Sequence, residues 1–345
     1  MNTTAAIMLL AGAVIPAGSA AGGLERLEFR QILMGVPVQI SVYAADKQAA
    51  NAAVHAAFDR IRQLNLIFSD YDEDSEISQV TRRALPGKLV SISPELAKVL
   101  DASLQISRQS GGAFDVSVGP LVKLWRASRR SKRLPTAEEL AAARKRVGYA
   151  SIHLDVGRRT VTFDKTGMQL DFGGIVKGYA ADEARAVLRA HGFSQALVAL
   201  SGDISVGDPP PGESGWKIGV GGVEPPDAQP KEFISLANRA VSTAGDAYQF
   251  VEIGGKHYSH LVDPHTGLGI TPRVSVTVIA PTGLLSDGLD STAAILGPER
   301  GRRLLESVSG VSARYAELTP EGPKTFDVGQ FSQYLVRPAR TEKRP

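Results

Sequence analysis

Residues 170–182 read LDFGGIVKGYAAD: an acid, two adjacent glycines, a lysine, a third glycine and, after small residues, a second acid. The flanking patterns predict a strand, MQLDF, before the glycines and a helix, YAADEARAVLRA, after them. Glycines at such a junction let backbone N–H groups approach a ligand, and the N-terminus of the helix favours an anion. The stretch therefore predicts a phosphate or pyrophosphate site with Lys177 as the cation. A tight turn is the alternative, and the spacing matches neither GxGxxG nor the Walker pattern.

Helices and strands are mixed on both sides of this stretch without a regular βαβ order. Helical spacing of apolar residues predicts helices at 46–68, 95–112, 182–193 and about 286–306. Alternation predicts a strand at 29–44, interrupted by one glycine, and shorter strands at 151–156, 160–164, 168–172, 195–200, 216–222, 231–238, 257–264 and 273–280. This mixture predicts an α+β fold with antiparallel-rich sheets flanked by helices.

Composition narrows the class of protein. The chain has 345 residues, 43% of them hydrophobic and 22% charged, and we expect a single domain over residues 22–340. A net charge of only +3 argues against a nucleic-acid partner, and the lack of cysteine excludes disulfides and thiolate chemistry.

The basic run RASRRSKR (126–133) predicts a solvated loop that enters a helix, with Thr136 and Glu139 as a capping box. A site for an anionic partner is the alternative.

The first 21 residues predict a signal peptide. They carry no charge, contain the run AAIMLLAGAVIPA and end in small residues, although they lack the usual basic start. We therefore expect export to the periplasm. An uncleaved anchor is the alternative.

Three further segments place polar side chains among apolar residues, in patterns that suit catalysis or ligand binding. In GGAFDVSVGPLVKLW (111–125), Asp115 forms a turn or faces a ligand. In HYSHLVDPHTG (257–267), His257 and His260 lie on opposite sides of the predicted strand, so they are not expected to share a metal. One of them suits a general base, and packing is the alternative.

The third segment is APTGLLSDGLDSTAAILG (280–297). Asp287 and Ser291 are four residues apart and share a face of a helix. Their oxygens suit Mg²⁺, and Asp290 or Thr292 could replace either ligand. The alternative is an N-capping aspartate followed by a serine in the first turn.

The order and spacing of these motifs resemble the FAD:protein FMN transferases, the ApbE family formerly labelled thiamine biosynthesis lipoproteins. The resemblance covers nearly all of the chain between the leader and about residue 315. It rests on LMGVPVQI (33–40), FSDYDEDSEIS (68–78), GGAFDVSVGPLVKLW, LDFGGIVKGYAAD, LVALSGDIS (197–205), VSTAGDAYQF (241–250), HYSHLVDPHTG and SDGLDSTAAILGPERG (286–301).

The resemblance implies a T-fold-like α+β architecture and an activity. Family members bind FAD and Mg²⁺, cleave the pyrophosphate, attach FMN to a threonine or serine of an acceptor protein, and release AMP. The resemblance implies that Tyr71 lies against the isoalloxazine ring and that His260, with His257 second, accepts the proton. The other implied FAD-binding residues are Met34, Gly35, Phe114, Asp115, Gly174, Lys177 and Asp203, and the implied metal ligands are Asp287, Ser291 and the carbonyl of Gly174.

The implied acceptor is an exported or membrane-attached redox-complex subunit with a Ser/Thr flavinylation motif, and we expect peripheral association with the inner membrane. The chain departs from the family pattern at Val36, Ala199, Ser201 and Ser291, where threonine, asparagine, glycine and threonine are usual. These departures keep two alternatives open: an Mg²⁺-dependent FAD pyrophosphatase and a non-catalytic FAD-binding protein.

Overall fold

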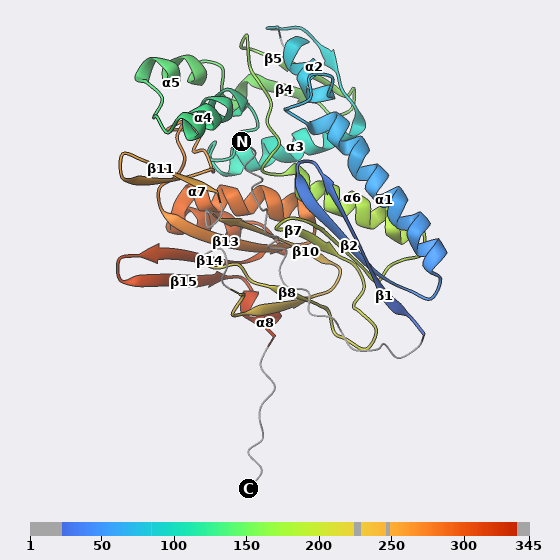
Figure 1. Ribbon diagram of the computed structural model, residues 1–345. Helices are drawn as coiled ribbons and strands as arrows, with labels where there is room; N and C mark the ends of the chain where they lie inside the picture. The colour runs from blue at the N-terminus through green and yellow to red at the C-terminus, as the bar shows by residue number, and fades with distance from the viewer. Residues whose placement is uncertain (1–22, 84, 224–228, 246–248, 337–345) are drawn as a thin grey trace, which may run out of the picture.

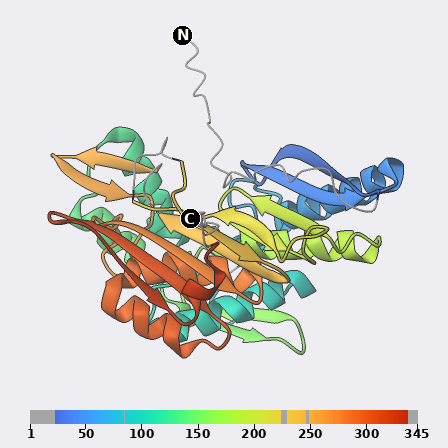
Figure 2. The ribbon, with the colours of Figure 1, turned by 90° about the horizontal axis from the view of Figure 1, so that it is seen from below.

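The computed structural model describes residues 23–83, 85–223, 229–245 and 249–336. Its centre is an eight-stranded sheet in which every neighbouring pair is antiparallel. Across the sheet the order is β1 (Glu25–Leu33), β2 (Val36–Ala44), β6 (Ala196–Leu200), β7 (Asp203–Val206), β10 (Arg239–Gly245), β13 (Arg273–Ala280), β14 (Ser312–Thr319) and β15 (Gly322–Val328). Figure 2 shows β1 and β2 (blue) at one end and β14 and β15 (red) at the other. The predicted α+β class is confirmed.

Helices cover one face of this sheet. α1 (Lys47–Phe68), α3 (Pro94–Gln109) and α6 (Val176–Ala190) bury their apolar stripes in one core with β2 and β6, while α7 (Gly283–Ser307) packs on β13 and β14. On the other face, β8 (Trp216–Gly219), β9 (Phe233–Leu236) and α8 (Phe331–Tyr334) enclose a core around Trp216. Figure 1 shows both layers. α7 bends at Gly297, whose φ is 76°, directly before Pro298.

The remaining elements are smaller. They are α2 (Glu76–Arg83), α4 (Gly119–Ser131), α5 (Ala137–Arg144), the 3₁₀ turn Tyr149–Ser151, the small sheet of β3 (Val90–Ser91), β5 (Thr160–Phe163) and β4 (Ile152–Asp155), and the hairpin β11 (Phe250–Ile253) with β12 (Lys256–Ser259). The predicted capping box of Thr136 and Glu139 is confirmed at the start of α5. In the described part of the chain, no helix has the length and apolar character needed to cross a membrane.

Three sequence-based predictions of local structure are wrong. The strand expected at 29–44 is a hairpin, because Met34 and Gly35 both adopt positive φ and reverse the chain. The basic run 126–133 is not a loop, since its first six residues belong to α4. MQLDF (168–172) is not a strand, because it contributes a single bridge between Gln169 and Val118.

The crossing of α6 and α7 explains one glycine of LDFGGIVKGYAAD. A Cβ atom on Gly178 would lie 2.0 Å from the carbonyl oxygen of Gly283, and a Cβ atom on Gly283 would lie 2.3 Å from the carbonyl oxygen of Gly178. No side chain fits at such separations. Gly178 therefore serves helix packing, which neither the phosphate-site nor the tight-turn interpretation anticipated.

Candidate active site

Three buried aspartates meet beside the N-terminus of α6. Asp203 begins β7, and Asp287 and Asp290 lie on α7. One carboxylate oxygen from each lies within 4.8 Å of the other two. Carboxylate oxygens are the ligands that Mg²⁺ prefers, so the chemistry of this acid cluster fits a hard divalent cation. Asp203 joins the cluster although the resemblance placed it at the nucleotide.

Lys177 is the cation of the acid cluster. It lies in the first turn of α6, which begins at Val176 rather than at Tyr179 as expected. Its Nζ donates to Asp203 and lies 3.6 Å from Oδ1 of Asp287. Burial lowers the pKa of Lys177, but the carboxylates of Asp203 and Asp287 outweigh burial and hold the pKa above its usual range. The lysine therefore stays charged.

A single lysine does not balance three carboxylates. Burial and the charge of Asp203 raise the pKa of Asp287 to about 7, although Lys177 and the Gly178 N–H act in the opposite direction. Burial, Asp287 and Asp203 raise the pKa of Asp290 well above its ordinary value. Carboxylates that hold protons near neutral pH release them when a divalent cation takes their place.

The two hydroxyls next to the cluster, on Ser291 and Thr292, both donate to backbone carbonyls of α7. Ser291 lies beside the glycine loop, because a Cβ atom on Gly174 would be 3.3 Å from its Oγ. The Ser291 hydroxyl donates to the carbonyl of Asp287 at 3.5 Å, and the Thr292 hydroxyl donates to the carbonyl of Gly288 at 2.5 Å. Asp287 and Ser291 share a face of α7 as predicted, but the aspartate is not the N-cap, which is Thr282. The metal-ligand role of Ser291 and of the Gly174 carbonyl stays a prediction.

Several predicted FAD-binding residues gather around this site. A Cβ atom on Gly174 would lie 3.7 Å from the ring of Phe114. Met34 and Gly35 form the β1–β2 turn, and the strand that follows carries Pro37, whose carbonyl accepts the Ser201 N–H at 3.0 Å. Because Ser201 directly precedes Gly202 and Asp203, the β1–β2 turn lies at the same end of the sheet as the acid cluster. Tyr71 lies in the loop before α2, and the residue is 78% exposed.

Asp115 forms a turn. Its Oδ1 accepts the backbone N–H and the hydroxyl of Ser117 at 2.8 and 2.6 Å, and its Oδ2 accepts the N–H of Tyr149 at 3.0 Å. Burial raises the pKa of this carboxyl, while these donors act to lower it. The turn interpretation is confirmed, and the role in nucleotide binding stays a prediction.

His260 lies just after β12, with Nδ1 3.1 Å from the carbonyl oxygen of Gln249. A carbonyl can only accept, so Nδ1 carries the hydrogen in the neutral ring and Nε2 carries the lone pair. That tautomer suits a proton acceptor. His257 lies within β12, and its ring stacks on Phe250 with the ring centroids 4.7 Å apart. The base role of either histidine stays a prediction.

Two departures from the family pattern have different structural settings. Ala199 packs with Ile204 and Trp216 on the sheet face away from α6, whereas Asp203 points toward Lys177. Residue 199 therefore contributes nothing to the acid cluster. Ser201 adopts φ 57° in the β6–β7 turn, a conformation that suits glycine better.

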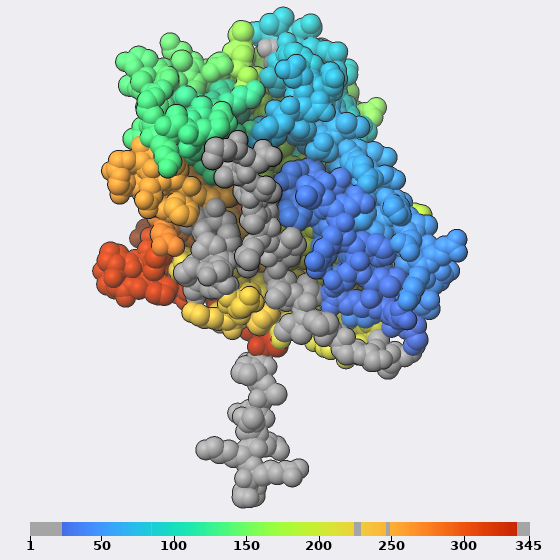
Figure 3. Space-filling model, in the orientation of Figure 1, coloured from blue at the N-terminus to red at the C-terminus, as the bar shows by residue number. Residues whose placement is uncertain are grey.

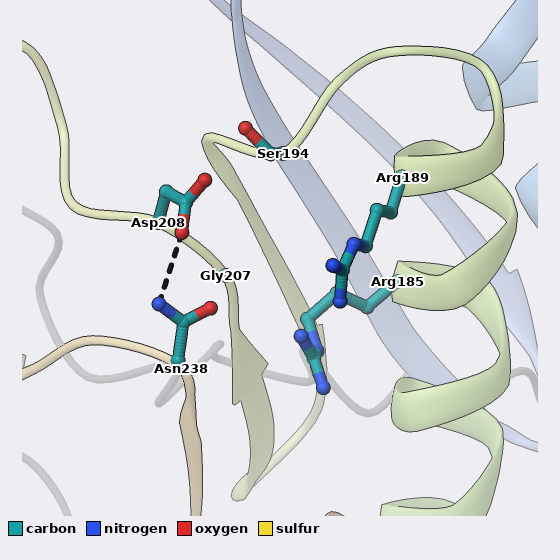
Figure 4. Close-up of a pocket in the computed structure, with 6 residues that line it drawn as sticks. All are labelled: Arg185, Arg189, Ser194, Gly207, Asp208 and Asn238. Atoms are coloured by element: carbon teal, nitrogen blue, oxygen red, sulfur yellow. Dashed lines mark hydrogen bonds between the residues drawn. The ribbon is translucent and has the colours of Figure 1, made fainter.

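A separate hollow of about 400 Å³ lies at the other end of α6 and β7. Figure 4 shows Arg185 and Arg189 projecting from α6 beside Asp208, which accepts a hydrogen bond from Asn238 at 2.9 Å. Ser194 and Gly207 complete the lining. Because Lys177 and Asp203 are at the opposite ends of these elements, the hollow is distinct from the acid cluster.

Comparison with known proteins places the chain in a family of flavin-transferring enzymes. The ApbE family model matches residues 34–315, and the chain belongs to this family. It is 31% identical to the FAD:protein FMN transferase of Klebsiella pneumoniae, over 88% of this chain and 87% of the relative. The relative from Treponema pallidum is 29% identical, over 86% of this chain and 87% of the relative.

Solved structures agree with the sequence comparison. The apo flavinyl transferase ApbE of Pseudomonas stutzeri superposes with a TM-score of 0.80 at 29% identity, covering 92% of this chain and 98% of that one. The flavin transferase ApbE of Vibrio cholerae gives 0.80 at 26% identity, covering 90% and 99%. The resemblance inferred from the motifs is thereby confirmed.

Proposed function

We propose that this chain is an Mg²⁺-dependent FAD:protein FMN transferase. Its family and the names of its relatives support the transfer of FMN from FAD to a protein. The structural observation that supports the reaction best is the contact of Lys177 with Asp203 and Asp287 at the glycine-rich loop. A fixed cation and a cluster of metal-binding oxygens suit pyrophosphate cleavage.

In the proposed reaction the hydroxyl oxygen of an acceptor threonine or serine attacks the FMN phosphorus of FAD. The bond from this phosphorus to the bridging oxygen breaks, and AMP leaves with that oxygen. Nε2 of His260 takes the hydroxyl proton, because a neutral hydroxyl is a weak nucleophile. FAD and the acceptor are thus converted into FMN-protein, AMP and a proton.

The chain's own residues orient the flavin and neutralise the negative charge that develops on the phosphates. Lys177 spreads the negative charge that moves onto the leaving phosphate, and the exposed ring of Tyr71 stacks on the isoalloxazine. Asp203, Asp287 and Asp290, with Ser291, would hold the Mg²⁺. When bound, the cation polarises the phosphoanhydride and neutralises charge on its oxygens.

The proposed setting is the periplasm, with an exported redox-complex subunit as acceptor. The leader 1–21, which lies outside the described residues, is the basis for this part of the proposal. The acceptor is a protein with a Ser/Thr flavinylation motif, at or near the inner membrane. Cell fractionation tests the location, because the mature protein should appear in the periplasmic or membrane fraction.

The experiment that tests the activity follows AMP release and the intact mass of the acceptor in one incubation with FAD and Mg²⁺. AMP together with an acceptor that gains one FMN supports the transferase. AMP without a mass gain would indicate a pyrophosphatase. Bound FAD without either product would indicate a flavin-binding protein.

A further inference from the structure

Arg126 of α4 lies against the ring of Tyr71. Its guanidinium carbon is 4.6 Å from the ring centroid, within the range of a cation–π contact. Tyr71 as a whole residue is nevertheless 78% exposed. Figure 3 shows the green segment that contains α4 adjoining the cyan segment around α2. Arg126 therefore supports an aromatic ring that stays largely open to a ligand.

Two carboxylates hold Arg126 in place. It donates a hydrogen bond to Asp70, the neighbour of Tyr71, and its Nη2 lies 3.6 Å from Oδ2 of Asp171. Burial lowers the pKa of Arg126, but Asp171 and Asp70 outweigh burial. A planar guanidinium fixed by two acids and one ring has little rotational freedom.

Asp171 connects this arrangement to the glycine-rich loop. Its Oδ1 accepts the N–H of Gly173 at 2.8 Å, and its own N–H donates to Val116 at 2.8 Å. Gly174, which faces Ser291 and Phe114, directly follows Gly173 in the chain. Arg126 thus joins the loop that carries Tyr71 to the loop that leads into Lys177.

We propose that Arg126 is a positioning residue for FAD. It orients the Tyr71 ring and fixes the position of that ring relative to the glycine-rich loop. The inference rests on the proposed function, because it assumes that Tyr71 contacts the flavin and that the loop contacts the pyrophosphate. An arginine with a purely structural role would stabilise α4 without acting through Tyr71.

A double-mutant cycle tests this coupling. FAD affinity is measured by calorimetry in metal-free buffer, where turnover does not interfere, for wild type, Arg126→Ala, Tyr71→Ala and the double variant. Each single variant should bind FAD about 10-fold more weakly, the scale of one aromatic contact. The double variant should bind no more weakly than Tyr71→Ala, because Arg126 acts through that ring. Arg130→Ala, at an exposed position of the same helix, should bind like wild type.

Arg126→Lys provides a second variant if Arg126→Ala fails to fold. It keeps the charge but loses the planar contact, and it should bind FAD more weakly than wild type with an unchanged melting temperature. Multiplicative effects in the double variant, or wild-type affinity in both Arg126 variants, would overturn the inference alone. A wild-type protein that binds no FAD either in metal-free buffer or with Mg²⁺ present would overturn the proposed function, and the inference with it.

Discussion

The carboxylate of Asp287 on α7 accepts the backbone N–H of Gly178 on α6 at 2.9 Å. Asp182 on α6 reciprocates, because its Oδ2 accepts the N–H groups of Gly283 and Leu284 at 2.7 and 3.2 Å. Each helix therefore satisfies N–H groups in the first turn of the other. This exchange fixes the position of Asp287 within the acid cluster.

Asp287 has two roles, which the variant Asp287→Asn separates: it accepts the Gly178 N–H, and it is a proposed metal ligand. Its amide oxygen can still accept the Gly178 N–H, but the charge needed for a metal is lost. We expect FMN transfer to fall at least about 100-fold and Mg²⁺ stimulation to disappear, on the scale of a lost catalytic electrostatic contact. Steady-state rates across an Mg²⁺ titration measure both.

Asp182→Asn is the matched control, since it alters the reciprocal helix contact outside the acid cluster. We expect a loss of less than about 1 kcal/mol in the free energy of unfolding, because the asparagine oxygen can still accept both N–H groups, with Mg²⁺ stimulation retained. Mg²⁺-stimulated transfer in Asp287→Asn would contradict its assignment as a ligand.

The acid cluster makes stability depend on pH. Asp287 has a pKa of about 7 in the folded protein against an ordinary 3.8, and the pKa of Asp290 is raised too. Between these values the folded state binds more protons than the unfolded chain, so the cluster's contribution to stability falls as pH rises from about 4 to about 7. The raised pKa of Lys177 has no effect there, because lysine is charged in both states below about pH 10.

Mg²⁺ should reverse this trend, because the cation replaces the protons. We expect the rise in melting temperature caused by Mg²⁺ to be larger at pH 8 than at pH 5. Thermal melts at both pH values, with and without the metal, measure the difference. A larger rise at pH 5 would count against metal binding by these carboxylates.

Gly178→Ala tests the packing of α6 on α7. The new Cβ atom would lie 2.0 Å from the carbonyl oxygen of Gly283, so the helices must move apart. We expect a loss of at least about 3 kcal/mol in stability, the upper range for overpacking. Gly157→Ala is the control, because its Cβ atom would meet nothing closer than 3.5 Å. Chemical denaturation compares the two variants, and equal stability would mean that the crossing is not tightly packed.

Ser201→Gly tests backbone strain beside the site. Ser201 has a φ of 57°, which costs a non-glycine residue about 1–2 kcal/mol, while glycine loses more chain entropy on folding. We expect a net gain in stability of up to about 1 kcal/mol, measured by urea denaturation. Ser201→Ala, which keeps a Cβ atom, should show no gain. A destabilised glycine variant would show that the serine side chain stabilises the turn.

Much of the fold follows from local sequence patterns. The apolar stripes of α1 and α3, the Thr136 capping box and the alternation in β13 depend on neighbouring residues, and these elements were predicted. The β1–β2 hairpin was missed because methionine at 34 is not a typical turn residue, although its φ is 51°. The basic run predicts a loop because its charges hide the apolar face of α4, which buries Leu121 and Trp125.

The candidate site was predicted only in part, because a local pattern reveals contacts between residues that are close in sequence and no others. Asp287 and Ser291 share a helix face, which a four-residue spacing reveals. The approach of Asp203 to Asp287 depends on how β7 and α7 pack, and no local pattern encodes that contact. The role of Gly178 was missed because its partner, Gly283, is distant in sequence and close only in the folded chain.

Transfer of FMN from FAD onto a protein hydroxyl is the reaction that sets this family apart from a pyrophosphatase or a flavin-binding protein. The most direct measurement is the intact mass of a flavin-acceptor domain after incubation with the purified protein, FAD and Mg²⁺. A matched acceptor whose target threonine is replaced by valine serves as the control. We expect a gain of one FMN on the threonine acceptor alone, with an equal amount of AMP. AMP released at the same rate with both acceptors, and no gain in mass, would contradict it.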